Sequence, residues 1–356
     1  MFNFNDLNTI QIEITSNCQA SCPMCARNYR GNLPNPKLKL NDWTLQDFNK
    51  IFNNDVLNQI KTITFCGSLG DPLMNNDLLS MVKLITNQHI NIHTNGSIRS
   101  TSYWAELAKA LPKKHKVVFG IDGLTDTHHL YRIGTNFEKI INNAKSFIEN
   151  GGTAEWVYIV FKHNAHQIEL AKKLAKDIGF SSFITKNSVR FTDENFNVYD
   201  KNGKTLYQLE PPNDNILSFV NKDTIQNFDE WFNNTEPSCQ VLKTKEIYID
   251  FQKIMYPCCW IASSFYLYTK PNDILHPYIL RINKECDQLI SDLGGYDFLS
   301  LDKNTIKNII NSKVWQTIYE NKWKNKDLLI CSKNCGVSKV RQISITPNQI
   351  INYETL

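Results

Sequence analysis

The strongest constraint on the fold is an alternation of short apolar segments with longer amphipathic segments over the first half of the chain. Runs of β-branched and aromatic residues predict strands at 10–14, 61–65, 90–94, 116–122, 154–161 and 181–185. Between them, apolar residues recur every three or four positions and predict helices at 44–52, 75–85, 102–111, 137–152 and 167–179. Strands that alternate with helices build a parallel sheet through right-handed crossovers, so we expect an α/β fold. This pattern does not separate a partial barrel from an open doubly wound sheet.

The regular alternation ends near Arg190, where a polar and turn-rich segment begins. We therefore predict a first domain at 1–192, a linker with a connecting helix at 193–238, and a second domain at 239–356. Within the linker, residues 201–204 predict a hairpin turn, and residues 224–234 predict the connecting helix.

The composition is that of an ordinary globular protein, with 42% hydrophobic and 21% charged residues. The net charge of +4 is scattered along the chain and gives little support to a nucleic-acid partner. No apolar run approaches the roughly 20 residues that span a bilayer, and no secretory signal is visible, so we predict a cytoplasmic protein without a membrane partner. The ten cysteines cluster in a way that suits metal ligation in a reducing compartment.

Three cysteines stand close together directly after the first predicted strand. The segment CQASCPMC contains Cys18, Cys22 and Cys25. Parallel α/β folds place their ligand sites at the carboxyl ends of strands, where this loop lies. Three thiolates can bind three irons of a [4Fe–4S] cube and leave the fourth iron open. A tetrahedral zinc site would need a fourth protein ligand, such as Cys66 or a histidine, and the spacing alone permits both.

The segment CQASCPMC resembles the C-x3-C-x2-C loop of the radical S-adenosylmethionine (radical SAM) enzymes. In that family the open iron binds the amino and carboxylate groups of S-adenosylmethionine. Reductive cleavage then gives methionine and a 5′-deoxyadenosyl radical, which abstracts a hydrogen from the substrate. The resemblance implies a [4Fe–4S] cluster on Cys18, Cys22 and Cys25, and a partial (β/α)6 TIM-like barrel.

Three later segments resemble the family's S-adenosylmethionine-binding motifs in the same order. CGSLGDPLMN is similar to the glycine–acid–proline segment that receives the methionine amino group, although Leu69 replaces its first glycine and an aspartate its usual glutamate. HTNGS is similar to a Thr-Asn-Gly segment, and FGIDGLTDTHHLYRIGT to a fourth-strand stretch, with Gly120 where a serine commonly contacts ribose. The resemblance implies that Arg132 pairs with the carboxylate and that the backbone of Met24 lies near the adenine. The implied contact residues are Met24, Gly70, Asp71, Pro72, Thr94, Asn95, Asp122 and Arg132.

A second set of cysteines lies in the predicted C-terminal domain. Cys239 precedes a predicted β-hairpin, Cys258 follows it, and Cys331 and Cys335 form a later pair. Paired thiols of this kind can converge on one iron–sulfur or zinc site. The pattern resembles the auxiliary-cluster extension called SPASM, in its shortened form called Twitch. The resemblance implies one auxiliary [4Fe–4S] cluster, and a zinc ribbon is the alternative.

This second set departs from the family pattern in several places. Cys259 is an alternative ligand to Cys258. Lys253 stands where the extension normally has a glycine, and residues 261–326 form a long insertion. Cys286 is isolated in the sequence, as expected for a small buried hydrophobe.

Other polar residues are weaker candidates. Lys186 and Arg190 follow the last predicted strand and could bind an anionic group of the substrate. We expect His128 and His129 on a solvent-exposed loop. Cys66 ends the second predicted strand, where a packed core thiol is expected rather than a radical donor.

The residues and the resemblance together predict a radical SAM enzyme with a smaller C-terminal, Twitch-like iron–sulfur domain. The resemblance implies oxidation or modification of a peptide or small molecule, and an electron donor such as flavodoxin or ferredoxin. The auxiliary cluster is expected to accept an electron, to bind substrate or to hold its domain together. Because the first predicted strand begins about ten residues into the chain, we expect no leader-binding domain ahead of it.

Three alternatives remain open from the sequence. One is a radical SAM enzyme that modifies a tRNA or nucleoside. Another uses the clusters for electron transfer or sensing without radical chemistry. The third is a non-catalytic scaffold in which both cysteine sets hold zinc or iron–sulfur clusters for structure alone. The sequence assigns no further catalytic residue.

Overall fold

The computed structural model divides into two compact units. It describes residues 1–188, 190–191, 195–212, 232–266, 277–338 and 350–356. Unit 1 comprises Met1–Ile12, Gln46–Ile63 and Val220–Pro347. Unit 2 comprises Glu13–Leu45, Thr64–Phe219 and Asn348–Leu356. The dividing line passes through strand β4 (Thr62–Phe65). The predicted division into 1–192, 193–238 and 239–356 stays a prediction, and most of the helix predicted at 224–234 lies outside the described residues.

Unit 2 is built on a mostly parallel sheet with the strand order β4-β5-β6-β7-β8-β15. The strands are β5 (His89–Thr94), β6 (His115–Gly120), β7 (Ala154–Val160), β8 (Ser182–Asn187) and β15 (Ile350–Thr355). Strands β5 to β8 pair in parallel in chain order, whereas β15 runs antiparallel to β8. The parallel order confirms the α/β fold predicted from the alternation of apolar segments.

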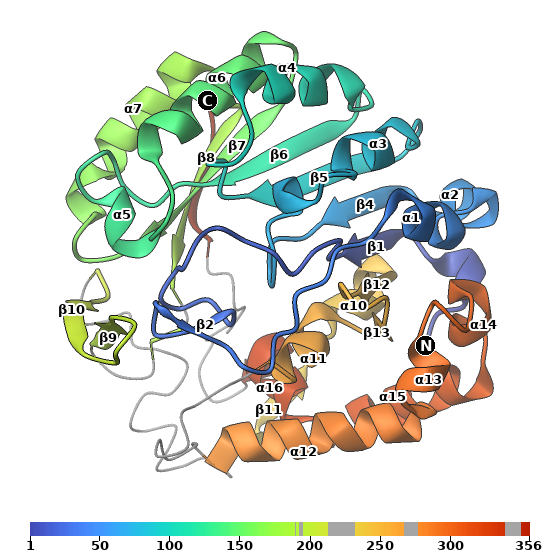
Figure 1. Cartoon of the computed structure of the whole chain (residues 1–356). Helices are drawn as coiled ribbons and strands as arrows, with labels where there is room; N and C mark the ends of the chain where they lie inside the picture. The colour runs from blue at the N-terminus through green and yellow to red at the C-terminus, as the bar shows by residue number, and fades with distance from the viewer. Residues whose placement is uncertain (189, 192–194, 213–231, 267–276, 339–349) are drawn as a thin grey trace. The chain divides into compact units, whose positions relative to one another are not determined.

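Amphipathic helices cover one face of this sheet, as Figure 1 shows for α4, α6 and α7. The helices that follow β4 to β7 are α3 (Leu78–Lys83), α4 (Thr101–Ala110), α6 (Phe137–Glu149) and α7 (Ile168–Ile178). The core beneath them is aromatic, with Trp104 and Phe147 of the helices against Phe119 of β6. Burying a side chain of this size contributes about 1.5–3 kcal/mol. Helix α7 ends at Gly179, whose φ of 97° suits a glycine C-cap.

Shorter elements of unit 2 connect the main strands. They are β2 (Asn28–Tyr29), β3 (Leu33–Pro34), η2 (Pro72–Met74), α5 (His128–Tyr131), η3 (Ala165–Gln167), β9 (Phe196–Tyr199) and β10 (Thr205–Leu209). Strands β9 and β10 form the hairpin that was predicted around residues 201–204. Tyr199 of β9 also bridges to Gly31, which follows the three-cysteine loop.

Unit 1 has the strand order β13-β12-β1-β4 and contains the helices of the C-terminal part of the chain. β1 (Thr9–Ile12) pairs in parallel with β12 (Glu246–Ile249), and β13 (Met255–Tyr256) returns antiparallel to β12 as the predicted hairpin. The remaining elements are η1 (Phe4–Asp6), α1 (Leu45–Ile51), α2 (Asn54–Gln59), β11 (Thr235–Pro237), α10 (Gln240–Thr244), α11 (Cys259–Ser264), α12 (Pro277–Asp292), α13 (Gly295–Leu299), α14 (Ile306–Ile310), α15 (Lys313–Lys324), α16 (Leu329–Cys335) and β14 (Gly336–Ser338). In the described part of the chain, no helix is both long and apolar enough to cross a membrane.

Lys253 adopts a backbone conformation that normally belongs to glycine. It lies between β12 and β13 with a φ of 63°, in the left-handed region. A side chain there costs roughly 1–2 kcal/mol. The ammonium group pairs with Asp47 at 2.8 Å and with Asp302 at 2.9 Å, and these ion pairs offset part of the strain. The departure from the family glycine is therefore accommodated within unit 1.

Gly70 permits a close backbone contact on which the candidate site depends. A Cβ atom at Gly70 would lie 2.0 Å from the carbonyl oxygen of Thr15, so a larger residue would push two loops apart. The next residue, Asp71, donates its backbone N–H to the carbonyl of Asn17 at 2.8 Å. The loop after β4 is thus held directly against the start of the three-cysteine loop.

We expect Gly70→Ala to lower the free energy of unfolding by about 3 kcal/mol, because neither backbone segment can yield. Gly151→Ala is the matched control: Gly151 has a φ of 92° but no atom within 4 Å of the added methyl group, so its cost should be only about 1 kcal/mol. Denaturant unfolding of the two variants measures the difference. Equal costs would contradict the close contact.

Candidate functional site

The candidate site lies at the carboxyl ends of the unit 2 strands, where three buried carboxylates each bind backbone N–H groups of a neighbouring segment. The three are Glu13, Asp71 and Asp122. Glu13, directly after β1, accepts hydrogen bonds from the backbone N–H groups of Ser68 (2.8 Å) and Leu69 (3.3 Å). Charge-assisted bonds of this kind are stronger than neutral ones. They fix the loop that contains the predicted glycine–acid–proline segment.

Asp71 is buried, and both of its carboxylate oxygens are occupied by protein donors. They accept hydrogen bonds from Thr94 Oγ1 (2.9 Å), Asn95 N (2.8 Å), Asn95 Nδ2 (2.6 Å) and Leu73 N (3.0 Å). Burial raises the pKa of Asp71, and the surrounding donors oppose that rise. Asp71 therefore joins the loops after β4 and β5, and the polar backbone of residues 70–72 is what this segment offers to a ligand.

Asn95 connects this network to the three-cysteine loop. Its side-chain amide donates to Asp71 and lies 3.7 Å from Cys18 Sγ, and its oxygen accepts from Gln19 Nε2 at 2.8 Å. Hydrogen bonds to cysteine sulfur tune the reduction potential of iron–sulfur clusters. The structure thus brings together two residues that the sequence predicted separately, one for metal binding and one for S-adenosylmethionine.

The three thiols of the loop are near neighbours. Burial raises the pKa of Cys22 to about 11, with Cys25 adding to the rise and Arg132 opposing it. Burial also raises the pKa of Cys18, with Asp71 and the other two thiols adding to it. Among the described residues, no three His, Cys, Asp or Glu side chains lie close enough to hold a metal ion.

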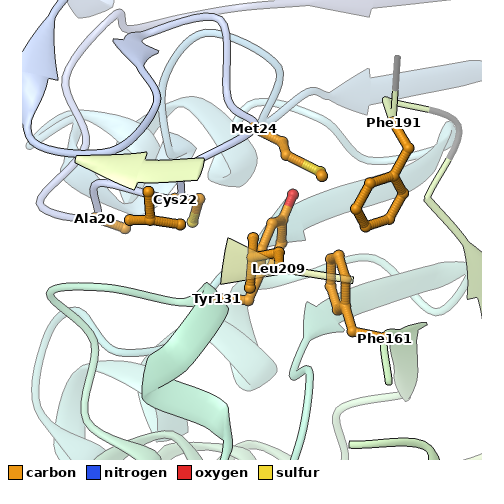
Figure 2. Close-up of a cluster of buried hydrophobic side chains, with 8 residues drawn as sticks. Ala20, Cys22, Met24, Tyr131, Phe161, Phe191 and Leu209 are labelled. Atoms are coloured by element: carbon orange, nitrogen blue, oxygen red, sulfur yellow. The ribbon is translucent and has the colours of Figure 1, made fainter. Parts of the chain in front are cut away.

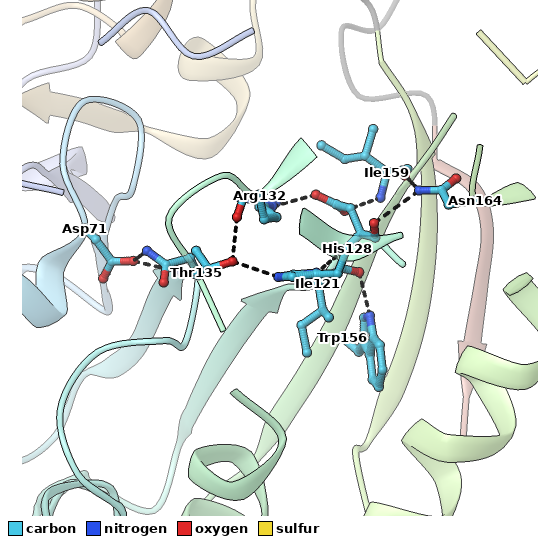
Figure 3. A network of polar contacts seen from close by, with 10 residues as sticks. Asp71, Ile121, His128, Arg132, Thr135, Trp156, Ile159 and Asn164 are labelled. Atoms are coloured by element: carbon cyan, nitrogen blue, oxygen red, sulfur yellow. Dashed lines mark hydrogen bonds and ion pairs between the residues drawn. The ribbon is translucent and has the colours of Figure 1, made fainter. Parts of the chain in front are cut away.

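Arg132 and Asp122 form a buried ion pair (Figure 3). Asp122 accepts Arg132 Nε at 2.6 Å through one oxygen and the backbone N–H of Ile159 at 2.6 Å through the other. The guanidinium also donates to the Cys22 thiol. Gly120 provides the space, because a Cβ atom there would lie 2.5 Å from Arg132 Nη2. A serine at this position, as is common in the family, would collide with the guanidinium.

His128 supports this pair from a buried position. Its Nδ1 accepts the backbone N–H of Asp122 (3.2 Å), and its Nε2 lies 2.9 Å from Thr135 Oγ1. Because the Thr135 hydroxyl donates to the carbonyl of Arg132, Nε2 carries the proton, and burial lowers the pKa of His128 to about 3. The expected loop is wrong for both histidines, which lie in helix α5. The expected exposure is confirmed for His129 and is wrong for His128, which is 1% exposed. The imidazole of His128 is buried because its Nδ1 accepts the hydrogen bond of the buried Asp122 N–H.

An apolar cluster covers the three-cysteine loop, as Figure 2 shows. Its members are Ala20, Cys22, Met24, Tyr131, Phe161, Phe191, Val198 and Leu209. Val198 lies on β9 and Leu209 on β10, so the hairpin packs onto the loop. The guanidinium of Arg30 lies 4.7 Å from the ring of Phe196 and adds a cation–π contact to the hairpin.

Met24 is held by residues that follow β8. Arg190 Nη1 donates to the carbonyl of Met24 at 2.6 Å, and Ser188 Oγ lies 3.2 Å from Met24 Sδ. Arg190 therefore contacts the cysteine loop itself. Lys186, which was predicted to follow the strand, lies within β8.

The residues present fit an iron–sulfur cluster with an anionic ligand. Three soft thiols on one loop match the ligand preference of iron–sulfur clusters. Beside them, Arg27 Nε and Asn28 Nδ2 are buried donors without a partner among the described residues. Arg27 Nη1 binds the carbonyl of Leu69 at 2.7 Å, which anchors the arginine at the loop after β4. Unsatisfied buried donors are costly, and a carboxylate can satisfy them.

The second cysteine set converges within unit 1. β11 and β14 pair so that the Ser238 N–H donates to the carbonyl of Cys335 at 2.7 Å, which brings Cys239 and Cys335 together. Burial raises the pKa of Cys258 well above its usual value, and the nearby Cys331 and Cys239 add to the rise. Four thiols predicted from distant parts of the sequence are thus neighbours.

Cys286 stands apart from this set. It is fully buried on α12, and burial raises its pKa to about 11 while a hydrogen bond with Ser264 opposes the rise. The prediction of a small buried hydrophobe is confirmed. Cys66, by contrast, is only half-buried at the end of β4.

Sequence reasoning missed two residues that organise the site, Glu13 and Arg27. Glu13 was visible as the one acid inside the apolar run 10–14, and a charged residue in such a run indicates a buried and paired group. Arg27 had no comparable signal, because its role depends on the carbonyl of Leu69 in another loop.

The fit between Gly120 and Arg132 can be tested by a double-mutant cycle. We expect Gly120→Ala to cost about 1–3 kcal/mol, because the methyl group displaces the guanidinium. Arg132→Ala should cost about 3–5 kcal/mol, because it leaves the buried Asp122 carboxylate unpaired. The double variant should be no less stable than Arg132→Ala alone, since the methyl group then occupies vacated space. Strictly additive unfolding free energies would contradict the contact.

His128 should make the protein less stable in mild acid. Its pKa falls from 6.5 to about 3 on folding, so only the unfolded chain takes up a proton between these values. Its contribution is complete above pH 6.5 and is lost as the pH falls, by up to about 1.4 kcal/mol per pH unit. His128→Gln should flatten the dependence of unfolding free energy on pH between about 6.5 and 5. His129→Gln is the exposed control, and a slope equal to that of His128→Gln would rule out this origin.

Comparison with known proteins agrees with this arrangement. Residues 12–175 match the Radical SAM superfamily. The matched segment contains the three-cysteine loop, the loops after β4 and β5, and the Asp122–Arg132 pair. No curated protein matches the chain in sequence.

Solved structures of two proteins share the fold. The histidine-tagged anSMEcpe with bound AdoMet has a TM-score of 0.52 at 14% identity, covering 96% of this chain and 93% of that chain. The crystal structure of Streptococcus suis SuiB has a TM-score of 0.50 at 13% identity, covering 88% of this chain and 68% of that chain. The α/β fold is therefore a partial TIM-like barrel with a further C-terminal region. With the three thiols after the carboxyl end of β1 and the match over residues 12–175, this part of the chain belongs to the radical SAM superfamily of enzymes.

Proposed function

We propose that this radical SAM enzyme abstracts a hydrogen atom from a peptide or small molecule and thereby oxidises or modifies it. The observation that carries the proposal is the single buried network that joins the Cys18 thiol to Asn95 and Asp71. A peptide substrate is supported by the solved structure of native anSMEcpe with bound AdoMet and Cp18Cys peptide, which has a TM-score of 0.50 at 16% identity over 92% of this chain and 88% of that chain.

Cys18, Cys22 and Cys25 are the residues that would hold the [4Fe–4S] cluster. When bound, this cluster supplies the electron that cleaves S-adenosylmethionine to the 5′-deoxyadenosyl radical. Asn95 donates its amide toward Cys18 Sγ and so stabilises the thiolate form of that ligand. The Arg132 guanidinium does the same at Cys22.

We assign S-adenosylmethionine binding to the loops around this network. The backbone of Gly70, Asp71 and Pro72 offers polar groups to the methionine ammonium, and Thr94 and Asn95 are held in place by the Asp71 carboxylate. The Asp71 N–H is bonded to the carbonyl of Asn17, which holds this loop edge in place.

Arg132, Asp122 and Met24 complete the assignment. Asp122 uses both oxygens within the protein and therefore positions Arg132, whose remaining guanidinium N–H donors we assign to the carboxylate. Met24 presents its backbone for the adenine from within the apolar cluster. That cluster also keeps water away from the loop, which a carbon radical requires.

An auxiliary [4Fe–4S] cluster on Cys239, Cys258, Cys331 and Cys335 is the second part of the proposal. Their mutual proximity in unit 1 and their likeness to the Twitch pattern support it. Burial raises the pKa of Cys258, and Cys259, Cys331 and Cys239 add to the rise. We assign Cys258 as the ligand, with Cys259 as the alternative. Such a cluster would accept an electron from the substrate, bind it or hold unit 1 together, and four thiols also suit zinc.

An external electron donor such as flavodoxin or ferredoxin would reduce the first cluster. The pattern of clustered cysteines, none of them in a disulfide among the described residues, supports a reducing, cytoplasmic setting.

The decisive test is anaerobic reconstitution followed by addition of S-adenosylmethionine and dithionite. We expect about eight irons per chain and formation of 5′-deoxyadenosine. Cys22→Ala should lose about four irons and all 5′-deoxyadenosine, because two thiolates do not hold the cluster with an open iron. Absence of 5′-deoxyadenosine from the fully loaded wild-type protein would overturn the proposal.

Two matched controls address the auxiliary site. Cys258→Ala should lose about four irons, whereas Cys259→Ala and the buried Cys286→Ala should keep the wild-type iron content. Zinc in place of the second set of irons would replace the auxiliary cluster with a structural zinc site and leave the first cluster's role intact.

A further inference from the structure

The inner face of the unit 2 sheet carries polar side chains that the cofactor site does not use. We call inner the face opposite helices α4, α6 and α7 in Figure 1. On β5, Ile90, Ile92 and Thr94 are buried, and Asn91 and His93 project from the other face because side chains alternate along a strand. The interior of a small barrel is normally filled by apolar side chains, so polar residues there need a reason.

His93 lies in a solvent-accessible but enclosed position. Its side chain is exposed, yet burial lowers its pKa to about 4, with Lys186 contributing to the decrease. A group on the outer surface would keep its contact with bulk water and its ordinary pKa. The side chain of His93 is exposed and makes no hydrogen bond within the described part of the chain, so its nitrogens are available to a ligand.

Lys186 occupies the same face of the sheet. The strand registers place His93 beside Val118, Val118 beside Glu155, and Ile159 beside Lys186, so these side chains share one face. In a flat sheet, β5 and β8 would be about 14 Å apart, because neighbouring strands are spaced by roughly 4.8 Å. His93 and Lys186 are the penultimate residues of β5 and β8. In a partial barrel the sheet curves, so inner-face side chains at the same end of these strands project into a common interior.

The Lys186 ammonium group has no ion-pair or hydrogen-bond partner among the described residues. The nearest acid on this face, Glu155, is already paired with Lys116 at 3.1 Å and lies 3.5 Å from the Tyr353 hydroxyl. Burial lowers the pKa of Lys186; the charge of Glu155 opposes this decrease only in part, and Lys116 adds to it. A cation held in this way is costly until an anion binds it.

Both residues lie next to the cofactor site. His93 immediately precedes Thr94, whose hydroxyl binds Asp71. Lys186 is two residues before Ser188, which contacts Met24. His93 and Lys186 thus lie at the carboxyl ends of their strands, one and two positions before residues of the candidate site.

We propose that Lys186 and His93 bind a carboxylate of the substrate at the inner face of the sheet, an inference that rests on the proposed function of unit 2. The lysine supplies the positive charge, and the neutral imidazole supplies one N–H donor. The substrate is thus a peptide or small molecule that carries a carboxylate close to the hydrogen that is abstracted. A single ammonium and a single imidazole match a carboxylate better than the larger and more highly charged phosphate.

The test uses the full-length, reconstituted protein and ligand-observed NMR, which does not require turnover. N-acetyl-aspartic acid amide and its isostere N-acetyl-asparagine amide are compared at millimolar concentration, and propionate is compared with propionamide. Wild-type protein should bind each carboxylate at least about tenfold more tightly than its amide, because a charge-assisted bond is lost in the amide. Tighter binding of the aspartate probe than of propionate would favour a peptide substrate, and the reverse order a small acid.

Lys186→Gln should abolish the preference for carboxylates, and Lys186→Arg should retain it. Lys173→Gln is the control, because Lys173 is exposed on α7 and pairs only with Asp177. Circular dichroism establishes that each variant is folded before it is compared. Two results for the wild-type protein would overturn the inference: equal binding of carboxylates and amides, or no detectable binding of carboxylates. Unchanged carboxylate binding by Lys186→Gln would also overturn it.

The two proposals fail separately. Formation of 5′-deoxyadenosine by the wild-type protein tests the radical SAM reaction without reference to Lys186. If 5′-deoxyadenosine forms and carboxylates are not preferred, only the carboxylate site is wrong. If carboxylates are preferred and no 5′-deoxyadenosine forms, the inner face is a binding site and the proposed reaction is wrong.

Discussion

The arrangement of unit 2 depends on carboxylates that are buried and bonded to the backbone of the adjacent strand or loop. Glu13 binds the loop after β4, Asp71 binds the loop after β5, and Asp122 binds β7. An ionised carboxylate inside a protein is costly unless several donors surround it, and here each has them. Each loop is thereby fixed to its neighbour, and the carboxyl edge of the sheet becomes one connected polar layer. The cysteine loop gains its position from this layer through Asn95.

This layer also explains why some residues predicted to contact S-adenosylmethionine instead hold neighbouring protein groups in place. The carboxylate oxygens of Asp71 and Asp122 accept hydrogen bonds from protein donors. These two residues therefore contribute to cofactor binding by positioning Asn95 and Arg132. Gly120 also positions Arg132, through the lack of a side chain. The absent side chain leaves room for the Arg132 guanidinium.

Much of unit 2 could be predicted from the sequence because its elements obey local patterns. Buried Ile90 and Ile92 alternate with polar neighbours, and the helices repeat their apolar residues every three or four positions. The three-cysteine site could be predicted because all three cysteines lie within one short loop. The burial of His128 could not, since it follows from an N–H of Asp122 that no local pattern reveals. The pairing of β15 with β8, and of β12 with β1, joins segments more than 160 residues apart and has no signal in either segment alone.

The β9–β10 hairpin has a consequence for how the protein matures. Val198 and Leu209 belong to the cluster that leaves Cys22 only 8% exposed, and they are synthesised long after the cysteine loop itself. Iron and sulfide must reach the Cys22 thiol before the hairpin packs over it, or the hairpin must move away each time a damaged cluster is replaced. Metal loading and packing of the hairpin therefore compete for the same surface. A chain that folds to completion without iron has to undo part of that packing, at the cost of exposing apolar side chains, before it can become active.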